Sequence, residues 1–348
     1  MGHRLLAASL ALTLGACTEA PDGAPPGPGP PRVVVERCGS HDDVLRVDQI
    51  QLKGSHNSYH VAPRFTLVPS HRYTHRPLRA QLEELGVRAL ELDVHLEDAK
   101  SGTLAVYHIA GIDSNSRCRR FDACLAEIRD WSRTHPCHLP VTVWIEAKDG
   151  TGGDDLDDPS VIDRAVLRVL DESDLLRPDD VRRDHASVRA ALEAEGWPPL
   201  ARARGRLMLV LLDRGDKTRV YTHGSAHLRG RLMFAQAEPS QFREPWAAFA
   251  KIDEPDARAA IEAAHAHHIL VGSNVCAAGR SDAECRARLR RGLAHGVHML
   301  KDDYPGPTEG RTYRLALPGG TPGRCNPVTA PEHCIPGMLV EAPTAAAR

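Results

Sequence analysis

Polar and ionisable side chains recur at the ends of several apolar runs of this sequence, where a strand would give way to a loop. The first run ends in GSHNSY, which contains His56 and Asn57. The second carries Glu91 and Asp93, which are two apart and so share one face of a strand. Later runs end in His108, in Glu146 with Lys148, and in Lys301, Asp302, Asp303 and Tyr304. Such groups at strand ends are typical of a ligand-binding or catalytic site.

The oxygen donors in this set predict a site for a hard divalent cation. Carboxylates that share one site without a partner repel one another, and a bound cation removes that cost. All-oxygen ligands suit Ca2+, with Mg2+ the less favoured ion, and do not suit zinc, which would recruit histidine or cysteine. The predicted ligands are Asn57, Glu91, Asp93 and Glu146.

His56 and His108 remain free of the predicted metal and can act as general base and general acid, because an unperturbed imidazole titrates near neutral pH. A cation between two such groups suits displacement at a phosphate. We assign Lys148, Lys301 and Tyr304 as candidate substrate-binding residues. Most of the 19 histidines are expected to be structural or superficial, and this class includes His60, His71, His75, His265 and His267.

The elements that must position these residues alternate between apolar strand-like runs and amphipathic helical patterns, which predicts an α/β fold with a parallel sheet. Eight runs favour a (β/α)8 TIM-type barrel. The barrel is expected to be irregular between its first and third strands, because LEDAKSGTL, between the second and third, is too short for a helix. The predicted strands are 49–55, 87–95, 103–108, 141–148, 206–213, 231–238, 268–274 and 296–303.

The two ends of the chain differ in composition from the predicted barrel at residues 47–306. Residues 1–17 have a basic start, a short apolar stretch and a lipobox-like ending at Cys17, which predicts a lipoprotein signal peptide. Residues 18–46 are expected to form a Pro/Gly-rich tether, and 307–348 a C-terminal extension. The protein is therefore expected to be exported and held through lipid at Cys17 on a bacterial membrane, the outer membrane or cell surface. An ordinary signal peptide and secretion are the alternative.

The nine cysteines of an exported chain predict disulfides, because thiols are oxidised outside the cytoplasm. Cys276 with Cys285 and Cys325 with Cys334 are near neighbours in sequence. Two further pairs are then expected among Cys38, Cys118, Cys124 and Cys137, with their connectivity left open. With 44 basic and 46 acidic residues, the net charge of −2 provides no global field for nucleic acid. We expect a monomer.

Four blocks of the sequence resemble the calcium-dependent phosphoinositide-specific phospholipases C, in particular their small secreted bacterial branch. These blocks are GSHNSY, GVRALELDVH, VYH and LPVTVWIEAKD, in this order, and they fall between about residues 47 and 150. The likeness implies that His56 is the base for an inositol hydroxyl and His108 the acid for the diacylglycerol oxygen. It also implies Ca2+ at the four predicted ligands. The products would be diacylglycerol and a cyclic or hydrolysed inositol phosphate.

Two other functions fit the same architecture. A glycerophosphodiester phosphodiesterase would also place two histidines and E-x-D around a divalent cation, but that family is similar to H-R-G at its first strand, whereas Asn57 and Ser58 follow His56 here. A lipid-anchored binding protein without turnover would have lost a histidine or a ligand, and all six residues are present. The expected substrate is thus a phospholipid or a glycerophosphodiester.

Overall fold

The computed structural model describes residues 25–33, 38–39, 41–149, 154–223, 227–320 and 322–341. The predicted signal peptide and Cys17 lie outside these residues, so the lipid anchor stays a prediction. Among the described helices, none combines the length and the apolar character needed to cross a bilayer.

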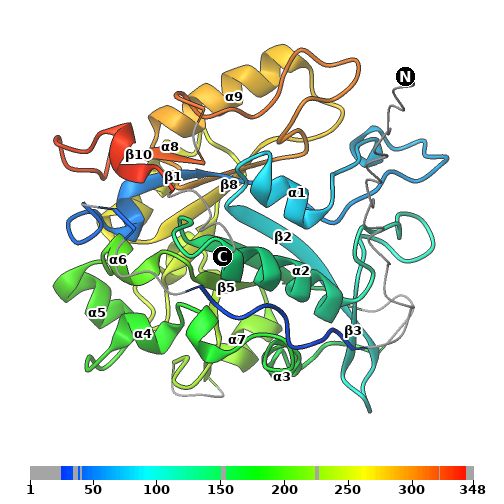
Figure 1. Ribbon diagram of the computed structural model, residues 1–348, viewed down its shortest axis with the longest axis horizontal. Helices are drawn as coiled ribbons and strands as arrows, with labels where there is room; N and C mark the ends of the chain where they lie inside the picture. The colour runs from blue at the N-terminus through cyan, green and yellow to red at the C-terminus, as the bar shows by residue number, and fades with distance from the viewer. Residues whose placement is uncertain are drawn as a thin grey trace, which may run out of the picture.

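Eight parallel strands form the centre of the molecule (Figure 1). They are β1 (Ile50–Lys53), β2 (Ala89–Asp98), β4 (Val141–Ala147), β5 (Leu207–Leu212), β6 (Met233–Ala235), β7 (Phe249–Lys251), β8 (Leu270–Cys276) and β9 (Met299–Asp302). Continuous pairing gives one sheet in the order β1-β9-β8-β7 and another in the order β2-β4-β5-β6.

Single parallel bridges join the two sheets at both seams. Gly54 pairs with Ala89 at the β1–β2 seam, and Gln236 pairs with Phe249 at the β6–β7 seam. Backbone hydrogen bonds support both joins, from Arg88 N to Lys53 O at 2.7 Å and from Ala237 N to Phe249 O at 2.8 Å. The eight strands therefore follow one another around a TIM-type barrel, and the predicted fold class is confirmed.

The predicted number of barrel strands is right, but one member was wrong. The run at 103–108 forms β3 (Thr103–Val106), which pairs antiparallel with β2 and lies outside the parallel set. A parallel pair needs a crossover of a dozen or more residues, and only four residues separate the two strands. The eighth member is instead β7, a three-residue strand that the sequence analysis did not predict.

Helices surround the strands, with α8 and α9 at the top of Figure 1 and α4 and α5 at its lower left. The helices are α1 (Leu78–Glu83), α2 (Phe121–Thr134), α3 (Ser160–Val166), α4 (Pro178–Arg182), α5 (Val188–Glu195), α6 (Leu200–Ala203), α7 (Asp216–His223), α8 (Arg258–Ala266) and α9 (Asp282–Ala294). Short 3-10 helices occupy Val47–Gln49, Pro69–His71, Glu172–Asp174, Pro239–Gln241 and Pro336–Leu339.

Alternation along the strands divides the apolar core into two clusters. Val143 and Ile145 of β4 pack in the larger cluster with the helices, whereas Trp144 belongs to the smaller cluster with Phe234 and Phe249 from other strands. Strand side chains alternate between the two faces of a sheet, so residues of Trp144 parity line the barrel interior. Glu146 has this parity and carries a carboxylate toward the C-terminal end of the barrel.

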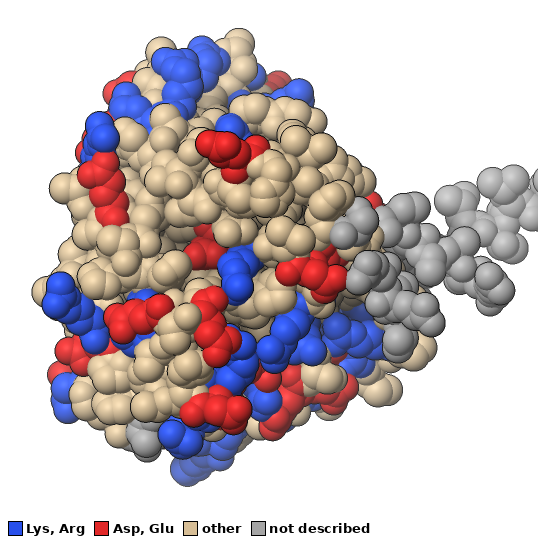
Figure 2. Space-filling view, turned by 90° about the vertical axis from the view of Figure 1, so that its left-hand side faces the viewer, with Lys and Arg blue, Asp and Glu red and all other residues tan. Residues whose placement is uncertain are grey.

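Segments outside the barrel pack against it. The 307–341 segment contributes a further strand, β10 (Gly323–Cys325), which pairs antiparallel with β1. Arg133 of α2 donates hydrogen bonds to Pro28 O and Pro30 O of the Pro/Gly-rich segment. Figure 2 shows one face of the molecule, on which basic and acidic side chains are interspersed.

Four disulfides confirm the predicted use of eight cysteines. The two near-neighbour pairs form as expected, Cys276–Cys285 and Cys325–Cys334. The connectivity left open by the sequence is Cys38–Cys137 and Cys118–Cys124. The first of these spans 99 residues and ties the N-terminal segment to the residues just before β4. Because it closes the longest loop of the four, it restricts the unfolded chain most.

Candidate active site

The turn after β1 places His56 and Asn57 at the C-terminal ends of the barrel strands. Gly54 is required there, because a Cβ atom would lie 2.8 Å from Cγ of Lys301. Asn57 adopts φ +42°, a conformation that asparagine tolerates better than most residues. His56 N donates to Asp302 O at 3.0 Å and Ser58 N to Glu91 O at 2.8 Å. The turn is thus held by the strands on both sides of it.

His56 is oriented by Asp303, a residue to which the sequence analysis gave no role. Its Nδ1 donates to Oδ1 of Asp303 at 2.7 Å, and its Nε2 lies 4.0 Å from Oε1 of Glu91. Asp303 is itself fixed by the backbone N–H of Ala278 at 2.6 Å. Burial alone would lower the pKa of His56, but the charges of Asp303 and Glu91 outweigh burial and raise it.

Three predicted metal ligands converge. Glu91, Asp93 and Glu146 each offer an oxygen within 4.8 Å of the others, and Asp93 lies opposite Glu146 in the β2–β4 pairing. Asp93 is buried; its Oδ1 accepts no hydrogen bond from the described residues, and its Oδ2 forms an ion pair with Lys148. Its burial, reinforced by the charge of Glu146, raises the pKa of Asp93 to about 6. A buried carboxylate oxygen without a partner, beside two other carboxylates, fits a Ca2+ site, and carboxylate oxygens are ligands that this ion prefers.

Lysines surround the carboxylates. Lys148 Nζ lies 3.1 Å from Asp93 Oδ2 and 2.5 Å from Glu146 Oε1. Lys251 Nζ donates to Glu91 Oε1 at 3.1 Å, and Lys301 pairs with Oε2 of the same carboxylate. Burial would raise the pKa of Glu91, but these two lysines outweigh it and hold that pKa well below its usual range. The sequence analysis missed Lys251 because it missed β7.

Lys301 and Tyr304, predicted as substrate-binding residues, both lie inside the protein. Lys301 is fully buried, and its ammonium also lies 4.8 Å from the centre of the Trp144 ring. Tyr304 is buried beneath Arg311, whose guanidinium stacks 3.9 Å from the centre of its ring. Of the three predicted substrate-binding residues, Lys148 is the one that solvent reaches most, with a quarter of its side chain exposed.

His108 lies on the loop after β3 and is oriented by Asp113. Its Nδ1 donates to Asp113 Oδ2 at 2.8 Å, while His60 Nε2 contacts Oδ1 of the same carboxylate at 2.8 Å. Burial would raise the pKa of Asp113, but the hydrogen bonds from His108 and His60 outweigh it and hold that pKa below its usual range. His60, expected to be a bystander, is fully buried beside this site. The sequence did offer one signal for this pair, because Asp113 lies only five residues after His108.

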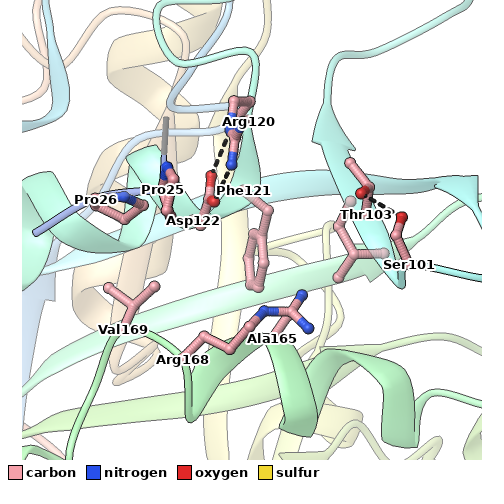
Figure 3. A pocket seen from close by; sticks show the side chains of 11 residues that line it. Pro25, Pro26, Ser101, Thr103, Arg120, Phe121, Asp122, Ala165, Arg168 and Val169 are labelled. Carbon is pink, nitrogen blue, oxygen red and sulfur yellow. Dashed lines mark hydrogen bonds and ion pairs between the residues drawn. The ribbon is translucent and has the colours of Figure 1, made fainter. Parts of the chain in front are cut away.

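A cleft borders the carboxylate group, and a separate pocket lies outside it. The cleft is lined by Glu146, Ala147, Leu212, Asp213, Arg214, Lys251 and Asp253. The separate pocket, shown in Figure 3, lies between the β2–β3 hairpin, α2, α3 and the segment at Pro25. Its Arg120 is paired with Asp122, and it contains none of the candidate catalytic or metal-binding residues. Of these two, the cleft is therefore the one that adjoins the candidate metal ligands.

Comparisons with known proteins identify a family match and a shared fold. The family model described as "Phosphoinositide phospholipase C, Ca2+-dependent" matches residues 45–106 and 99–327. No curated protein sequence matches the chain. The solved structures that share the fold include two bacterial phospholipases C. The Ca2+-dependent phosphatidylinositol-specific phospholipase C from Streptomyces antibioticus is 20% identical, with a TM-score of 0.56, covering 75% of this chain and 96% of its own.

The second structure is the apo form of a calcium-dependent phosphoinositol-specific phospholipase C from a Gram-negative Pseudomonas species. It is 18% identical, with a TM-score of 0.57, and the match covers 82% of this chain and 97% of that one. These identities show the fold alone, whereas the family model extends over most of the chain. The chain therefore belongs to the Ca2+-dependent phosphoinositide phospholipase C family of phosphodiesterases.

Proposed function

We propose that this protein cleaves the glycerol-side phosphodiester of phosphatidylinositol-type lipids, giving diacylglycerol and a cyclic or hydrolysed inositol phosphate. The observation that carries the proposal is a pair of imidazoles, each held at Nδ1 by its own carboxylate, beside one group of three acidic side chains. Of the three acidic side chains, Glu91 lies nearest His56, and the charge of His108 acts to lower the pKa of Asp93. Two oriented imidazoles suit a reaction that removes one proton and supplies another.

The two histidines divide the proton transfers. His56 accepts the proton of an inositol hydroxyl at Nε2, because Asp303 engages its Nδ1. That hydroxyl attacks phosphorus, and the bond to the glycerol oxygen breaks. His108 donates a proton from Nε2 to the departing oxygen, with Asp113 stabilising the charged imidazole. Hydrolysis of the cyclic product would use the same groups with their roles exchanged.

Asn57, Glu91, Asp93 and Glu146 would hold the calcium ion. When bound, Ca2+ offsets charge on the phosphoryl oxygens and lowers the pKa of a nearby hydroxyl. Lys251 and Lys301 each pair with one oxygen of the Glu91 carboxylate and so hold it in place. We therefore assign Lys301 this positioning role in preference to direct contact with substrate. Lys148 remains the candidate for contact with the phosphate.

Exposed apolar residues at the rim support a substrate that resides in a bilayer. Phe65 and Leu67 are 88% and 94% exposed on the loop between β1 and β2, and Ile112 is 66% exposed on the loop that carries His108. The two loops touch, since Asn115 Nδ2 donates to Ala62 O at 3.3 Å. Large apolar side chains that project together are typical of an interaction surface. We infer that they enter the lipid around the head group.

The four disulfides also support export, because such bonds persist in oxidising compartments. We retain lipid attachment at Cys17 as the proposed anchor, with secretion as the alternative.

A panel of phosphodiesters tests the function. Phosphatidylinositol, glycerophosphoinositol and glycerophosphocholine are assayed with Ca2+ and with chelator. We expect Ca2+-dependent release of diacylglycerol from phosphatidylinositol, and loss of most turnover in His56→Asn and His108→Asn, by about 10²- to 10⁴-fold. Full turnover in chelator, or preference for glycerophosphocholine, would contradict the proposal.

A further inference from the structure

A second group of metal-binding atoms lies outside the proposed Ca2+ site. Nδ1 or Nε2 of His71, Nδ1 or Nε2 of His108 and a carboxylate oxygen of Asp113 all lie within 4.8 Å of one another. Asp113 Oδ2 is 2.8 Å from His108 Nδ1 and 3.5 Å from His71 Nδ1. None of these residues belongs to the group of Glu91, Asp93 and Glu146, so the two groups are separate in composition.

His71 indicates that the cluster is more than an orienting network for His108. It is 8% exposed, and its Nδ1 is buried without a hydrogen-bond partner among the described residues. This nitrogen faces Asp113 at a distance too long for a hydrogen bond. The His71 and His108 rings pack edge to face, with 5.2 Å between their centres. A buried imidazole nitrogen without a partner is costly unless something binds it.

The donor set selects the ion. Two imidazole nitrogens and one carboxylate oxygen suit zinc, which takes three protein ligands and keeps a fourth position open in accessible sites. Ca2+ prefers oxygen ligands alone and therefore remains with the carboxylate group. His60 holds the other oxygen of Asp113 at 2.8 Å, which would fix the carboxylate as outer-sphere hydrogen bonds do for metal ligands.

We propose that His71, His108 and Asp113 form an inhibitory Zn2+ site. Zinc takes Nδ1 of His108, and the proton of that imidazole then resides on Nε2. A neutral, zinc-bound imidazole is a much weaker acid than an imidazolium, so His108 no longer protonates the departing oxygen. The inhibitory effect rests on the proposed role of His108, whereas zinc binding does not.

The experiment measures binding and turnover separately in the full chain, prepared without a polyhistidine tag and saturated with Ca2+. Free Zn2+ is set with a metal buffer, binding is followed by competition with a chromophoric chelator, and turnover is measured on phosphatidylinositol vesicles. We expect one Zn2+ per chain and loss of turnover with the same midpoint. His71→Phe keeps the ring but removes the ligand, and should weaken binding and inhibition at least about tenfold, with normal turnover in zinc-free buffer.

His333→Phe is the matched control, since His333 is exposed and distant in sequence from the cluster, and it should bind zinc as the unmodified protein does. His71→Asn provides a second substitution if the phenylalanine variant is unstable. Equal zinc affinity in the His71 variants and the unmodified protein would overturn the proposal. So would displacement of zinc by Ca2+, which would place zinc at the carboxylates. A protein inactive on phosphatidylinositol would still report binding, so failure of the function is distinguishable.

Discussion

The ammonium of Lys148 lies 3.1 Å from Oδ2 of Asp93, between the carboxylates that are proposed to hold calcium. It also lies 2.5 Å from Oε1 of Glu146. One positive charge thus compensates two of the three acidic ligands. Burial would lower the pKa of Lys148, but Asp93 and Glu146 outweigh it and raise that pKa. Lys148 would therefore compete with a bound Ca2+ for the same oxygens.

Removal of this competitor should tighten calcium binding. We expect Lys148→Met to raise the affinity for Ca2+ about three- to tenfold, which corresponds to ~1 kcal/mol for a partly exposed ion pair. Isothermal titration calorimetry measures the affinity, and Lys100→Met, at an exposed lysine of the β2–β3 hairpin, is the control. Unchanged or weaker Ca2+ affinity in Lys148→Met would show that the ammonium does not compete with the ion.

Asp93 should destabilise the protein when calcium is absent, because burial and the charge of Glu146 raise its pKa to about 6 and Lys148 only partly offsets them. Asp93→Asn removes the charge at nearly constant volume. We expect the variant to melt at a higher temperature in chelator, with a gain of about 1–2 kcal/mol, and to lose the stabilisation that Ca2+ gives the unmodified protein. Thermal unfolding with and without Ca2+ tests both parts. A variant that Ca2+ stabilises normally would exclude Asp93 as a ligand.

Asp113 should affect turnover without affecting calcium. Asp113→Asn retains the size of the side chain but no longer stabilises a charged His108, so we expect kcat to fall by about 10²-fold or more. Asp113 lies outside the carboxylate group, so the Ca2+ affinity should stay constant. Steady-state kinetics and calcium titration on the same preparation separate the two effects. A kcat within twofold of normal would reject the orienting role.

The sequence predicts which acidic side chains come together better than it predicts the details of the fold. Glu91 and Asp93 could be placed on one face because strand periodicity is local, and Glu146 follows by the same rule. The partner of His56 could not be predicted, because its contact with Asp303 joins residues 247 apart. Lys301 shows a further limit. Its position near a strand end suggested access to substrate, whereas packing against Trp144 and Glu91 leaves it fully buried.

The exposed rim should matter for a bilayer and not for a soluble substrate. The double variant Phe65→Ser/Leu67→Ser removes two apolar side chains, each worth about 1.5–3 kcal/mol when fully buried. We expect turnover on phosphatidylinositol vesicles to fall by about tenfold or more, with turnover of glycerophosphoinositol unchanged. Val328→Ser/Ile335→Ser, at two exposed apolar residues of the C-terminal segment, is the control. Equal loss on both substrates would indicate damage to the site rather than loss of membrane contact.

His298 should make the fold sensitive to acid. Val271 N donates to its Nδ1 and its Nε2 donates to Asp48 O, both at 3.0 Å, so the buried ring is held neutral. Burial, with the neighbouring His265, lowers the pKa of His298 to about 3, and Asp48 only partly opposes this.

Because the unfolded chain protonates His298 near its ordinary pKa of 6.5, it binds more protons than the folded protein between pH 6.5 and about 3. The free energy of unfolding should therefore decrease as the pH is lowered through this range. His298 should account for a loss of about 2–3 kcal/mol near pH 4.5. Denaturant unfolding at several pH values measures the slope. His298→Gln should be less stable at pH 7 and show a smaller loss on acidification, since one titrating group is gone. His267→Gln, at a half-buried histidine that directly follows α8, is the comparison. An identical slope in His298→Gln and the unmodified protein would show that His298 is not responsible.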